Sequence, residues 1–394
     1  MLSLLKQRNI LILTVCQVLF WVTLMAGIAV TSLVGQILAS DNFYATFPAG
    51  FLALSGIFVT RIASSLMQKF GRKLGFLIGA TSGVAGCALC MLAILQSSFI
   101  MFCIGSAILG AHQAIGLYYR LAATDAVPME NKGQAVSVVM AGGVAAAVIA
   151  PTLSLWSQKL LMPYLYAGTF AVLALLCVAI FLLLALLEDQ QVTEENSAGQ
   201  GRSLGELFRQ PVLIMAVTNA AVAQGLMVLL MLSMPLAMVA CGFGKDVPVT
   251  VMQWHFLAMF GPSFFTGNLI QKFGAANVAL AGALLLLSSI VFAATGITFY
   301  NFSVALILLG LGWNFMHVAG TTMVTYTHLP EERGKVQGTS EMIILCVSAC
   351  AAFSSGGLQS EYGWTVVNIA AVPVIIVAAL ITWRFSRTQE YKTI

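Results

Sequence analysis

The sequence predicts an all-α membrane protein in which twelve transmembrane helices form two six-helix repeats. Three observations predict this fold. The chain has 394 residues, of which 60% are hydrophobic and only 8% are charged. Apolar runs recur along the whole chain, and each approaches or exceeds the roughly 20 residues that cross a bilayer as a helix. Short loop sequences recur about half a chain apart, which indicates that a set of six helices is duplicated.

The twelve expected spans follow one another with short polar connections. They cover approximately residues 10–38, 43–66, 74–95, 99–124, 134–155, 163–187, 212–240, 248–270, 276–298, 300–327, 337–358 and 363–386. We therefore expect an N-terminal half at 1–187, a cytoplasmic linker at 188–211 and a C-terminal half at 212–394. The linker is polar and typical of flexible segments. Within it, Ser203 and Glu206 have the capping-box spacing of a short helix, whose Leu204, Leu207 and Phe208 we expect to face the membrane.

The basic residues are distributed unequally between the two predicted sides of the membrane. One side holds Lys69, Arg72, Lys73, Lys132, Arg202, Arg209, Lys272, Arg333 and Lys335, whereas the other keeps only Lys159 and Lys245. The positive-inside rule places the crowded side, with both termini, in the cytoplasm. The net charge of +4 is thus an orientation signal, and we expect no nucleic-acid partner. The loops are too short to house a catalytic domain, so we expect no enzyme.

Two pairs of loop sequences record the duplication. Leu66-Met67-Gln68-Lys69-Phe70-Gly71 follows the second span, and Leu269-Ile270-Gln271-Lys272-Phe273-Gly274 follows the eighth, 203 residues later. Pro128-Met129-Glu130-Asn131-Lys132-Gly133 follows the fourth span, and Pro330-Glu331-Glu332-Arg333-Gly334 follows the tenth. Six spans duplicated in parallel are typical of transporters that hold their substrate between the halves near the bilayer midplane.

Methionines line one face of each of the seventh and eighth spans. Met227, Met231, Met234 and Met238 step by four, three and four residues along the seventh, and Met252, His255 and Met259 by three and four along the eighth. A short turn should make the two spans antiparallel neighbours, so that the stripes converge level by level. Thioethers select copper(I), and imidazole also suits copper. The other interpretation is packing, because methionine is an adaptable core filler. A histidine inside a span favours a functional role.

The repeated loop resembles the signature of the major facilitator superfamily, Gly-x-Leu-Ala-Asp-Arg-x-Gly-Arg-Lys. Ser64-Ser65-Leu66-Met67-Gln68-Lys69-Phe70-Gly71-Arg72-Lys73 follows it from the leucine onward. Ser64 replaces the first glycine and Gln68 replaces the acid, and Gln271 repeats the second change. The resemblance implies that the two loops take part in the conformational change, through Gln68, Lys69, Gly71, Arg72, Gln271, Lys272 and Gly274. A hydrogen-bonded latch would then replace the charged one.

The stripes also resemble a more specific group, the CcoA-like bacterial copper importers. Met227-x-x-x-Met231 is followed 24 residues later by His255-x-x-x-Met259, which matches the two motifs of that family. The resemblance implies an inner-membrane importer whose metal ligands are Met227, Met231, His255 and Met259, and which supplies copper for oxidase assembly. Met234, Met238, Met252 and Cys241 would guide the ion in from the outer mouth. A monomer in the lipid bilayer, with no cofactor besides the copper it carries and a copper acceptor in the cytoplasm, is expected.

Two further interpretations remain open. The wider family includes importers that lack these motifs and carry riboflavin-like solutes, so the chain could be a permease for a riboflavin-like or drug-like organic solute. It could also be a membrane sensor or assembly factor that binds copper without transporting it. His112 and His317 occupy roughly corresponding places in the two halves. They are candidates for a second ligand station, or else for packing.

Overall fold

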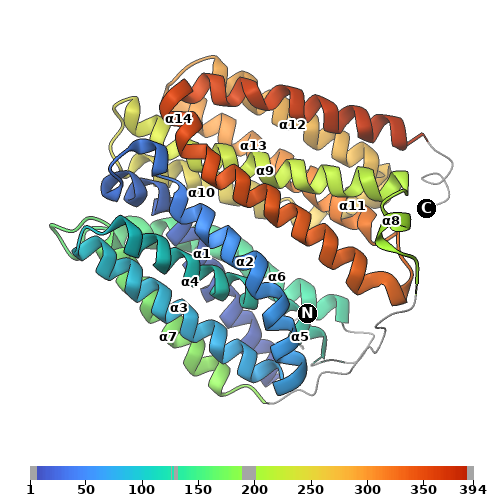
Figure 1. Ribbon diagram of the computed structural model, residues 1–394, viewed down its shortest axis with the longest axis horizontal. Helices are drawn as coiled ribbons and strands as arrows, with labels where there is room; N and C mark the ends of the chain where they lie inside the picture. The colour runs from blue at the N-terminus through green and yellow to red at the C-terminus, as the bar shows by residue number, and fades with distance from the viewer. Residues whose placement is uncertain (1–6, 126, 128–131, 189–200, 388–394) are drawn as a thin grey trace. The chain divides into compact units, whose positions relative to one another are not determined.

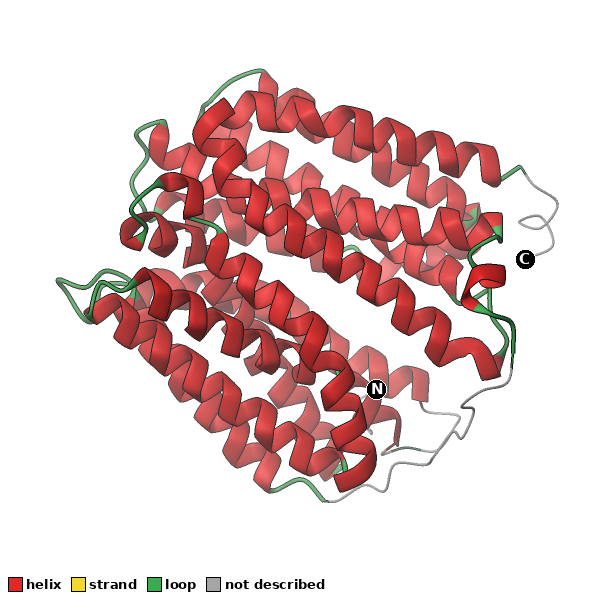
Figure 2. Cartoon of the chain, viewed as in Figure 1, coloured by secondary structure: helices red, strands yellow, loops and turns green. Residues whose placement is uncertain are grey.

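The computed structural model describes residues 7–125, 127, 132–188 and 201–387, and in this part of the chain every regular element is a helix (Figure 2). The chain divides into two compact units, Met1–Glu194 and Glu195–Ile394. The division falls within the linker predicted at 188–211. Helices in each unit run alongside one another and are joined mostly by short turns, as the ribbon in Figure 1 shows.

The first unit is a bundle of long apolar helices. Its elements are α1 (Arg8–Leu38), η2 (Asn42–Tyr44), α2 (Phe47–Phe70), α3 (Arg72–Leu95), α4 (Phe99–Gly116), α5 (Tyr119–Asp125), α6 (Lys132–Ser157) and α7 (Ala167–Ala185). Helix α1 packs mainly against α6, α2 against α4, and α3 against both α4 and α7. Close approaches are made at glycines: a Cβ on Gly110 of α4 would lie 2.9 Å from Ser55 Cβ of α2.

The second unit repeats this plan. Its elements are α8 (Leu204–Leu207), α9 (Pro211–Ala240), α10 (Val247–Phe260), α11 (Ser263–Phe273), α12 (Ala275–Ala294), α13 (Phe299–Val324), η4 (Pro330–Glu332) and α14 (Arg333–Phe385). Helix α13 contacts α12, α9 and α10, and α9 also packs along the red helix α14 (Figure 1). Helix α13 is therefore the central element around which the second unit is built.

These helices account for the twelve predicted spans. Nine helices in the described part of the chain are long and apolar enough to cross a bilayer. One of them, α14, carries both the eleventh and the twelfth span, because 53 residues run on across a kink at Gly363. The fifth span is α6, which contains Pro151, and the eighth is divided into α10 and α11. The fold is a twelve-helix membrane bundle of two repeats, as predicted.

Proline and glycine explain where two of the spans differ from a single straight helix. The eighth span breaks at Gly261-Pro262, since proline has no backbone N–H and clashes with the preceding turn. Gly363 has φ 74° and ψ 171°, a conformation that favours glycine, and so turns the chain between the two halves of α14. The first unit's counterpart of the eighth span, α2, has no such break. The break thus distinguishes the second unit from the first.

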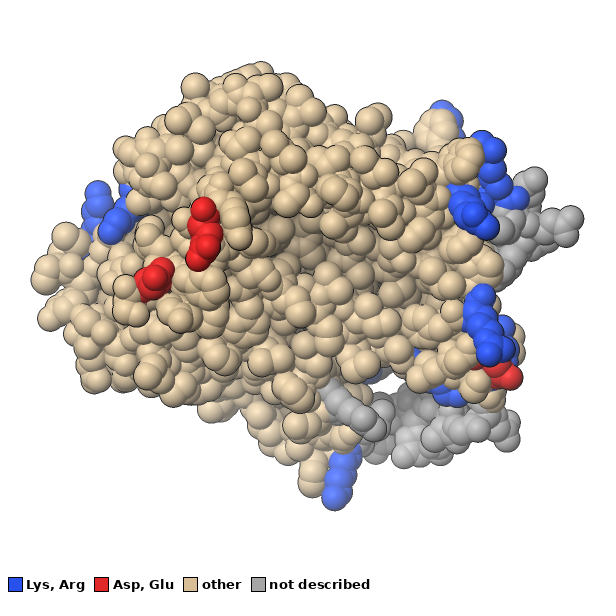
Figure 3. All heavy atoms as spheres, turned by 45° about the horizontal axis from the view of Figure 1, so that its top comes forward, with Lys and Arg blue, Asp and Glu red and all other residues tan. Residues whose placement is uncertain are grey.

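The distribution of side chains fits a bilayer. On the face shown in Figure 3, Lys, Arg, Asp and Glu lie toward the ends of the helices, and the wide region between them carries none. Many large apolar side chains are exposed on the helices, including Phe58, Leu175, Leu284 and Leu380, each at least 58% exposed. Exposed apolar surface on membrane-spanning helices contacts lipid tails. The chain is a multi-pass membrane protein.

The short helix predicted in the linker is present, but one of its side chains is buried in the protein and does not face the membrane. Ser203 and Glu206 form both hydrogen bonds of a capping box at the start of α8. Leu207 was expected to face the membrane, but it is fully buried in the core of the second unit with Val212 and Val336. Burial of an apolar side chain is favourable. Leu207 therefore holds the segment that leads into α9 against the core of the second unit.

Candidate functional site

His255 lies in the core of the second unit, where it joins α10 to α13. Its side chain is fully buried, and its Nδ1 lies 2.8 Å from the carbonyl oxygen of Leu306. A carbonyl only accepts hydrogen bonds, so Nδ1 carries the hydrogen and Nε2 of the neutral ring carries the lone pair. Nε2 is buried and has no hydrogen-bond partner among the described residues. Metal-binding histidines commonly use this same anchoring of one ring nitrogen by a carbonyl.

The backbones of α10 and α13 are in close contact beside His255. A Cβ built on Gly310 of α13 would lie 2.7 Å from the His255 carbonyl oxygen and 3.1 Å from the Met259 nitrogen. Only a glycine allows this approach without a shift of one helix. The level of α10 that carries His255 and Met259 is therefore packed against α13.

The side of α9 that meets α13 at Ala216 and Ala220 is also the side that carries Met227 and Met231. A Cβ on Gly320 would lie 2.8 Å from both Ala216 O and Ala220 N of α9. Residues 220, 224, 227 and 231 step by four, three and four, so Met227 and Met231 continue that face. Met227, Met231, Met234, Met238, Met252 and Met259 are all buried.

The structure places a third helix, α13, beside both helices that carry the stripes. Helices α9 and α10 contact each other little, while α13 contacts both extensively. The connecting turn at Cys241–Asp246 joins the two helices but does not determine what covers their faces. Whether Met227, Met231, His255 and Met259 bind a metal remains a prediction. Among the described residues, no three His, Cys, Asp or Glu side chains are grouped as metal ligands.

A second set of side chains from α9, α10 and α13 forms an aromatic and amide cluster, of which sequence reasoning singled out only His317. Trp313 and His317 of α13 stack with ring centroids 4.9 Å apart and planes 13° apart. The Trp313 indole N–H donates to Oε1 of Gln224 at 2.9 Å. The ring of Phe260, the last residue of α10, lies 6.4 Å from Trp313 at 49°. We call Gln224, Phe260, Trp313 and His317 the aromatic cluster.

The aromatic cluster differs from the His255 site because all four of its side chains are only partly buried. A stacked pair of flat rings beside an amide can bind a planar heterocycle, by stacking and by hydrogen bonding at its edge. The sequence did contain a signal for it. Gln224, Trp313 and His317 are polar or amphipathic groups inside apolar spans, and such groups are often functional.

Phe260 lies directly before the break in the eighth span. Asn314 of α13 is buried, and its amide donates to Met259 O at 2.7 Å and to Ser263 Oγ at 2.8 Å. The hydroxyl of Thr266 donates to Asn314 Oδ1 at 2.6 Å. Pro262 interrupts the helix, and Asn314 satisfies polar groups around the interruption. Since Asn314 directly follows Trp313, one turn of α13 positions both the broken span and the cluster.

The two histidines proposed as a second station have different environments. His112 of α4 is fully buried, its Nδ1 lies 2.9 Å from Gly79 O, and its ring lies 5.3 Å from that of Phe20. His317 is partly buried in the aromatic cluster, with Nδ1 3.4 Å from Ala220 O. The two histidines therefore occupy corresponding positions in the sequence, but their surroundings in the structure differ. His112 resembles His255 more closely than it resembles His317.

The repeated loops have the same geometry in both units. Lys69 lies over the ring of Phe70 at 5.3 Å, and Lys272 lies over Phe273 at 5.2 Å. Gly71 and Gly274 both have positive φ, 87° and 83°, which explains glycine at each position. Gln271 is exposed, Arg72 is partly buried, and the side chain of Gln68 lies outside the described residues. Cys241 at the end of α9 is exposed and is a free thiol.

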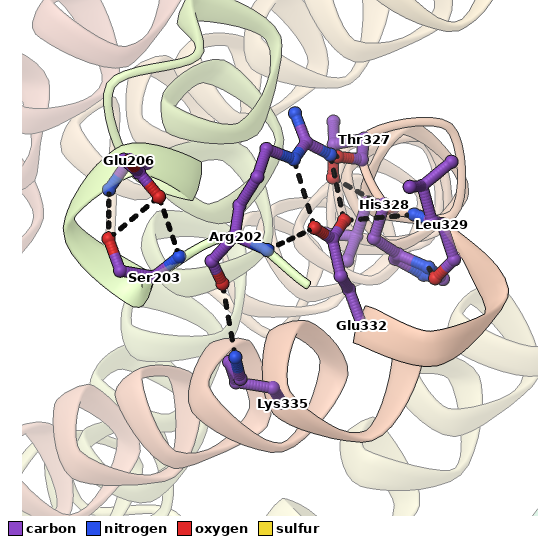
Figure 4. Close-up of polar contacts among 9 residues, drawn as sticks. Arg202, Ser203, Glu206, Thr327, His328, Leu329, Glu332 and Lys335 are labelled. Atoms are coloured by element: carbon purple, nitrogen blue, oxygen red, sulfur yellow. Dashed lines mark hydrogen bonds and ion pairs between the residues drawn. The ribbon is translucent and has the colours of Figure 1, made fainter. Parts of the chain in front are cut away.

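A further polar site ties the end of the linker to the turn between α13 and α14 (Figure 4). The backbone N–H and Nε of Arg202 donate to Oε1 of Glu332 at 2.8 and 3.0 Å, and Nη2 donates to Oε2 at 2.8 Å. The Leu329 N–H donates to Oε2 at 3.0 Å. These donors lower the pKa of Glu332 to about 2. Arg202 and Glu332 lie 130 residues apart, so their sequence signals, a basic residue and a repeated loop, do not predict that they pair.

The fold and the cluster together define a class of protein. Two six-helix repeats, with partly buried polar and aromatic groups inside the spans, are the architecture of a membrane transporter. The Major Facilitator Superfamily matches residues 10–262 and 247–393. The chain belongs to this superfamily, as its loop sequences suggested.

Comparisons with individual proteins agree with this assignment. The chain is 37% identical over 371 residues to the riboflavin transporter RfnT of Brucella anthropi, covering 94% of this chain and 93% of the relative. It is 27% identical over 405 residues to the uncharacterized MFS-type transporter YddS of Bacillus subtilis, covering 98% of this chain and 93% of the relative. The crystal structure of a D-xylose-proton symporter has a TM-score of 0.75 at 15% identity, covering 96% of this chain and 97% of that one, and is similar in fold. Copper import has no support among these relatives.

Proposed function

We propose that this protein is a secondary transporter of the bacterial inner membrane that moves a small planar organic solute of the riboflavin class by alternating access. The observation that carries the proposal is the 37% identity to a riboflavin transporter along nearly the whole of both chains. Both termini lie in the cytoplasm in this proposal, because the basic residues concentrate on that side.

The aromatic cluster supports the same class of solute. Stacking of a base-like ring on an aromatic side chain stabilises binding by about 1–3 kcal/mol, and any flat heterocycle presents such a face. Gln224 adds a polar group beside the Trp313–His317 pair. A site with large stacking surface and few polar groups is typical of small-molecule pockets.

Copper import, the prediction from the methionine stripes, is the second candidate. It is favoured by one observation, the buried lone pair on His255 Nε2 beside an anchored Nδ1. Against it, α13 and not α9 is the main neighbour of α10, and Gly310 and Leu306 of α13 pack beside His255. We therefore place the organic solute first.

Transport assays separate the two candidates. Purified protein in sealed vesicles is given radiolabelled riboflavin in one series and copper(I) in the other. We expect riboflavin to accumulate and copper to remain at the level of protein-free vesicles. Trp313→Ala should reduce riboflavin transport strongly, whereas Trp254→Ala, a change at an exposed tryptophan of α10, should not. Copper uptake without riboflavin uptake would reverse the order of the candidates.

A further inference from the structure

The hydrogen bond between Trp313 and Gln224 determines which way the glutamine amide points. An indole nitrogen is a donor only, so the atom of Gln224 that faces Trp313 must be the carbonyl oxygen Oε1, at 2.9 Å. The two ends of a glutamine amide are otherwise hard to tell apart, but a donor-only neighbour settles the choice. The Nε2 amino group of Gln224 is consequently directed away from the indole, with both of its hydrogens to donate.

The surroundings of Gln224 make this orientation relevant to a ligand. Gln224 is partly buried on the face of α9 that meets α13, and it lies beside the stacked rings of Trp313 and His317. One face of Trp313 is covered by His317, and Phe260 is tilted against it at 49°. The aromatic cluster thus supplies ring surfaces, and Gln224 supplies hydrogen-bond donors at their edge.

We propose that Gln224 is the specificity-determining residue of this site and donates hydrogen bonds to acceptor atoms at the edge of a planar heterocycle. The inference rests on the proposed function and deepens it. Trp313 acts in two ways, as a stacking surface and as the positioning residue that presents the Gln224 amino group. Ligands with a carbonyl oxygen or a bare ring nitrogen at that edge are accepted. Ligands without such an acceptor are rejected, because the amino group is then left without a partner.

Variants at Gln224 test the donor directly. Gln224→Glu keeps the size of the side chain and can still accept the Trp313 N–H, but its ionised carboxylate, the form assayed at neutral or higher pH, has no hydrogen to donate. We expect its affinity for riboflavin, measured by quenching of flavin fluorescence on purified protein, to fall by about tenfold or more. Gln253→Glu makes the same change on α10 and should leave the affinity unchanged. Trp313→Phe keeps an aromatic ring, releases the amide from its fixed orientation, and should weaken binding to an intermediate degree.

Ligand analogues separate a direct contact from an effect on packing. In 1-deaza- and 5-deazariboflavin a ring nitrogen is replaced by C–H, and in 2-thio- and 4-thioriboflavin a carbonyl oxygen is replaced by the weaker acceptor sulfur. At least one of the four should bind the unmodified protein several-fold more weakly than riboflavin does. That difference should disappear in Gln224→Glu, since the donor is gone. A role in packing alone would lower the thermal stability of the variant without removing the discrimination.

The outcomes are distinguishable. If the unmodified protein binds riboflavin and Gln224→Glu binds it equally well, the donor role of Gln224 is overturned and the proposed function stands. Equal loss of affinity for riboflavin and all four analogues in the variant would also overturn it. If the unmodified protein binds no riboflavin, the proposed function fails and this inference fails with it.

Discussion

The side-chain amide of Asn314 donates a hydrogen bond of 2.7 Å to the backbone carbonyl of Met259, just before the eighth span breaks. The same amide contacts Ser263 and Thr266 beyond the break. One buried side chain therefore holds α10 and α11 to α13. It does so one residue from Trp313, whose ring belongs to the aromatic cluster.

Replacement of Asn314 should destabilise the second unit. Asn314→Leu leaves the Met259 carbonyl and the two hydroxyls without their amide partner, and a buried polar group left unsatisfied costs about 1–3 kcal/mol. We expect a loss of about 2 kcal/mol or more in unfolding free energy, measured by thermal or denaturant unfolding in detergent. Asn277→Leu is the matched control, because Asn277 is exposed at the start of α12 and its amide donates to Phe273 O, four residues earlier at the end of α11. Equal stability of the two variants would contradict the role given to Asn314.

A methyl group at Gly310 should separate α10 from α13. The new Cβ would meet the His255 carbonyl oxygen at 2.7 Å, and backbone atoms have little room to move. Overpacking of this kind typically costs about 1–3 kcal/mol. Gly338→Ala, in α14, should have the opposite sign, because nothing lies within 4 Å of its Cβ and alanine favours a helix by up to about 1 kcal/mol. Melting temperatures of the two variants give the comparison, and a stabilised Gly310→Ala would be incompatible with the close contact.

The Arg202–Glu332 pair should make stability depend on pH in the acidic range. The pKa of Glu332 is lowered to about 2 by its hydrogen bonds from Arg202 and Leu329, so folding favours the charged form. The stabilisation is complete above the ordinary carboxyl pKa and is lost as the pH falls toward 2. Glu332→Gln should therefore lower the melting temperature at pH 7, and the difference from the unmodified protein should shrink as the pH approaches 3. Glu331→Gln, at an exposed neighbouring residue, is the control.

The methionine stripes provide a test that separates packing from ligation. Met231→Leu and Met259→Leu nearly conserve volume and should each cost less than about 1.5 kcal/mol in stability. We expect both variants to transport riboflavin close to the rate of the unmodified protein. Met215→Leu, a buried methionine of α9 outside the stripe, is the matched control. The copper interpretation would be restored by one result: the unmodified protein and the Met215→Leu control take up copper, and both stripe variants do not.

Much of the fold follows from local sequence features. Runs of apolar residues predict the spans because a bilayer admits only segments whose backbone is satisfied internally. The repeated Lys69-Phe70 and Lys272-Phe273 sequences predict equivalent turns, and both pairs have the same cation–π contact. The predicted capping box of Ser203 and Glu206 is confirmed as well. Its contacts join residues three apart, so they depend on local sequence alone.

The sequence by itself determined the class of protein, the number of spans and the duplication, because these depend on composition and on spacing along the chain. Tertiary structure decided which faces meet. Spans seven and eight are adjacent in sequence, yet α13 is the main neighbour of α10, so the level of His255 packs against Gly310 and Leu306. The pairing of Gln224 with Trp313 joins residues 89 apart, and that of Arg202 with Glu332 joins residues 130 apart. Such contacts arise from how the helices pack against one another, and helical periodicity shows which side chains share a face but not which helix covers it.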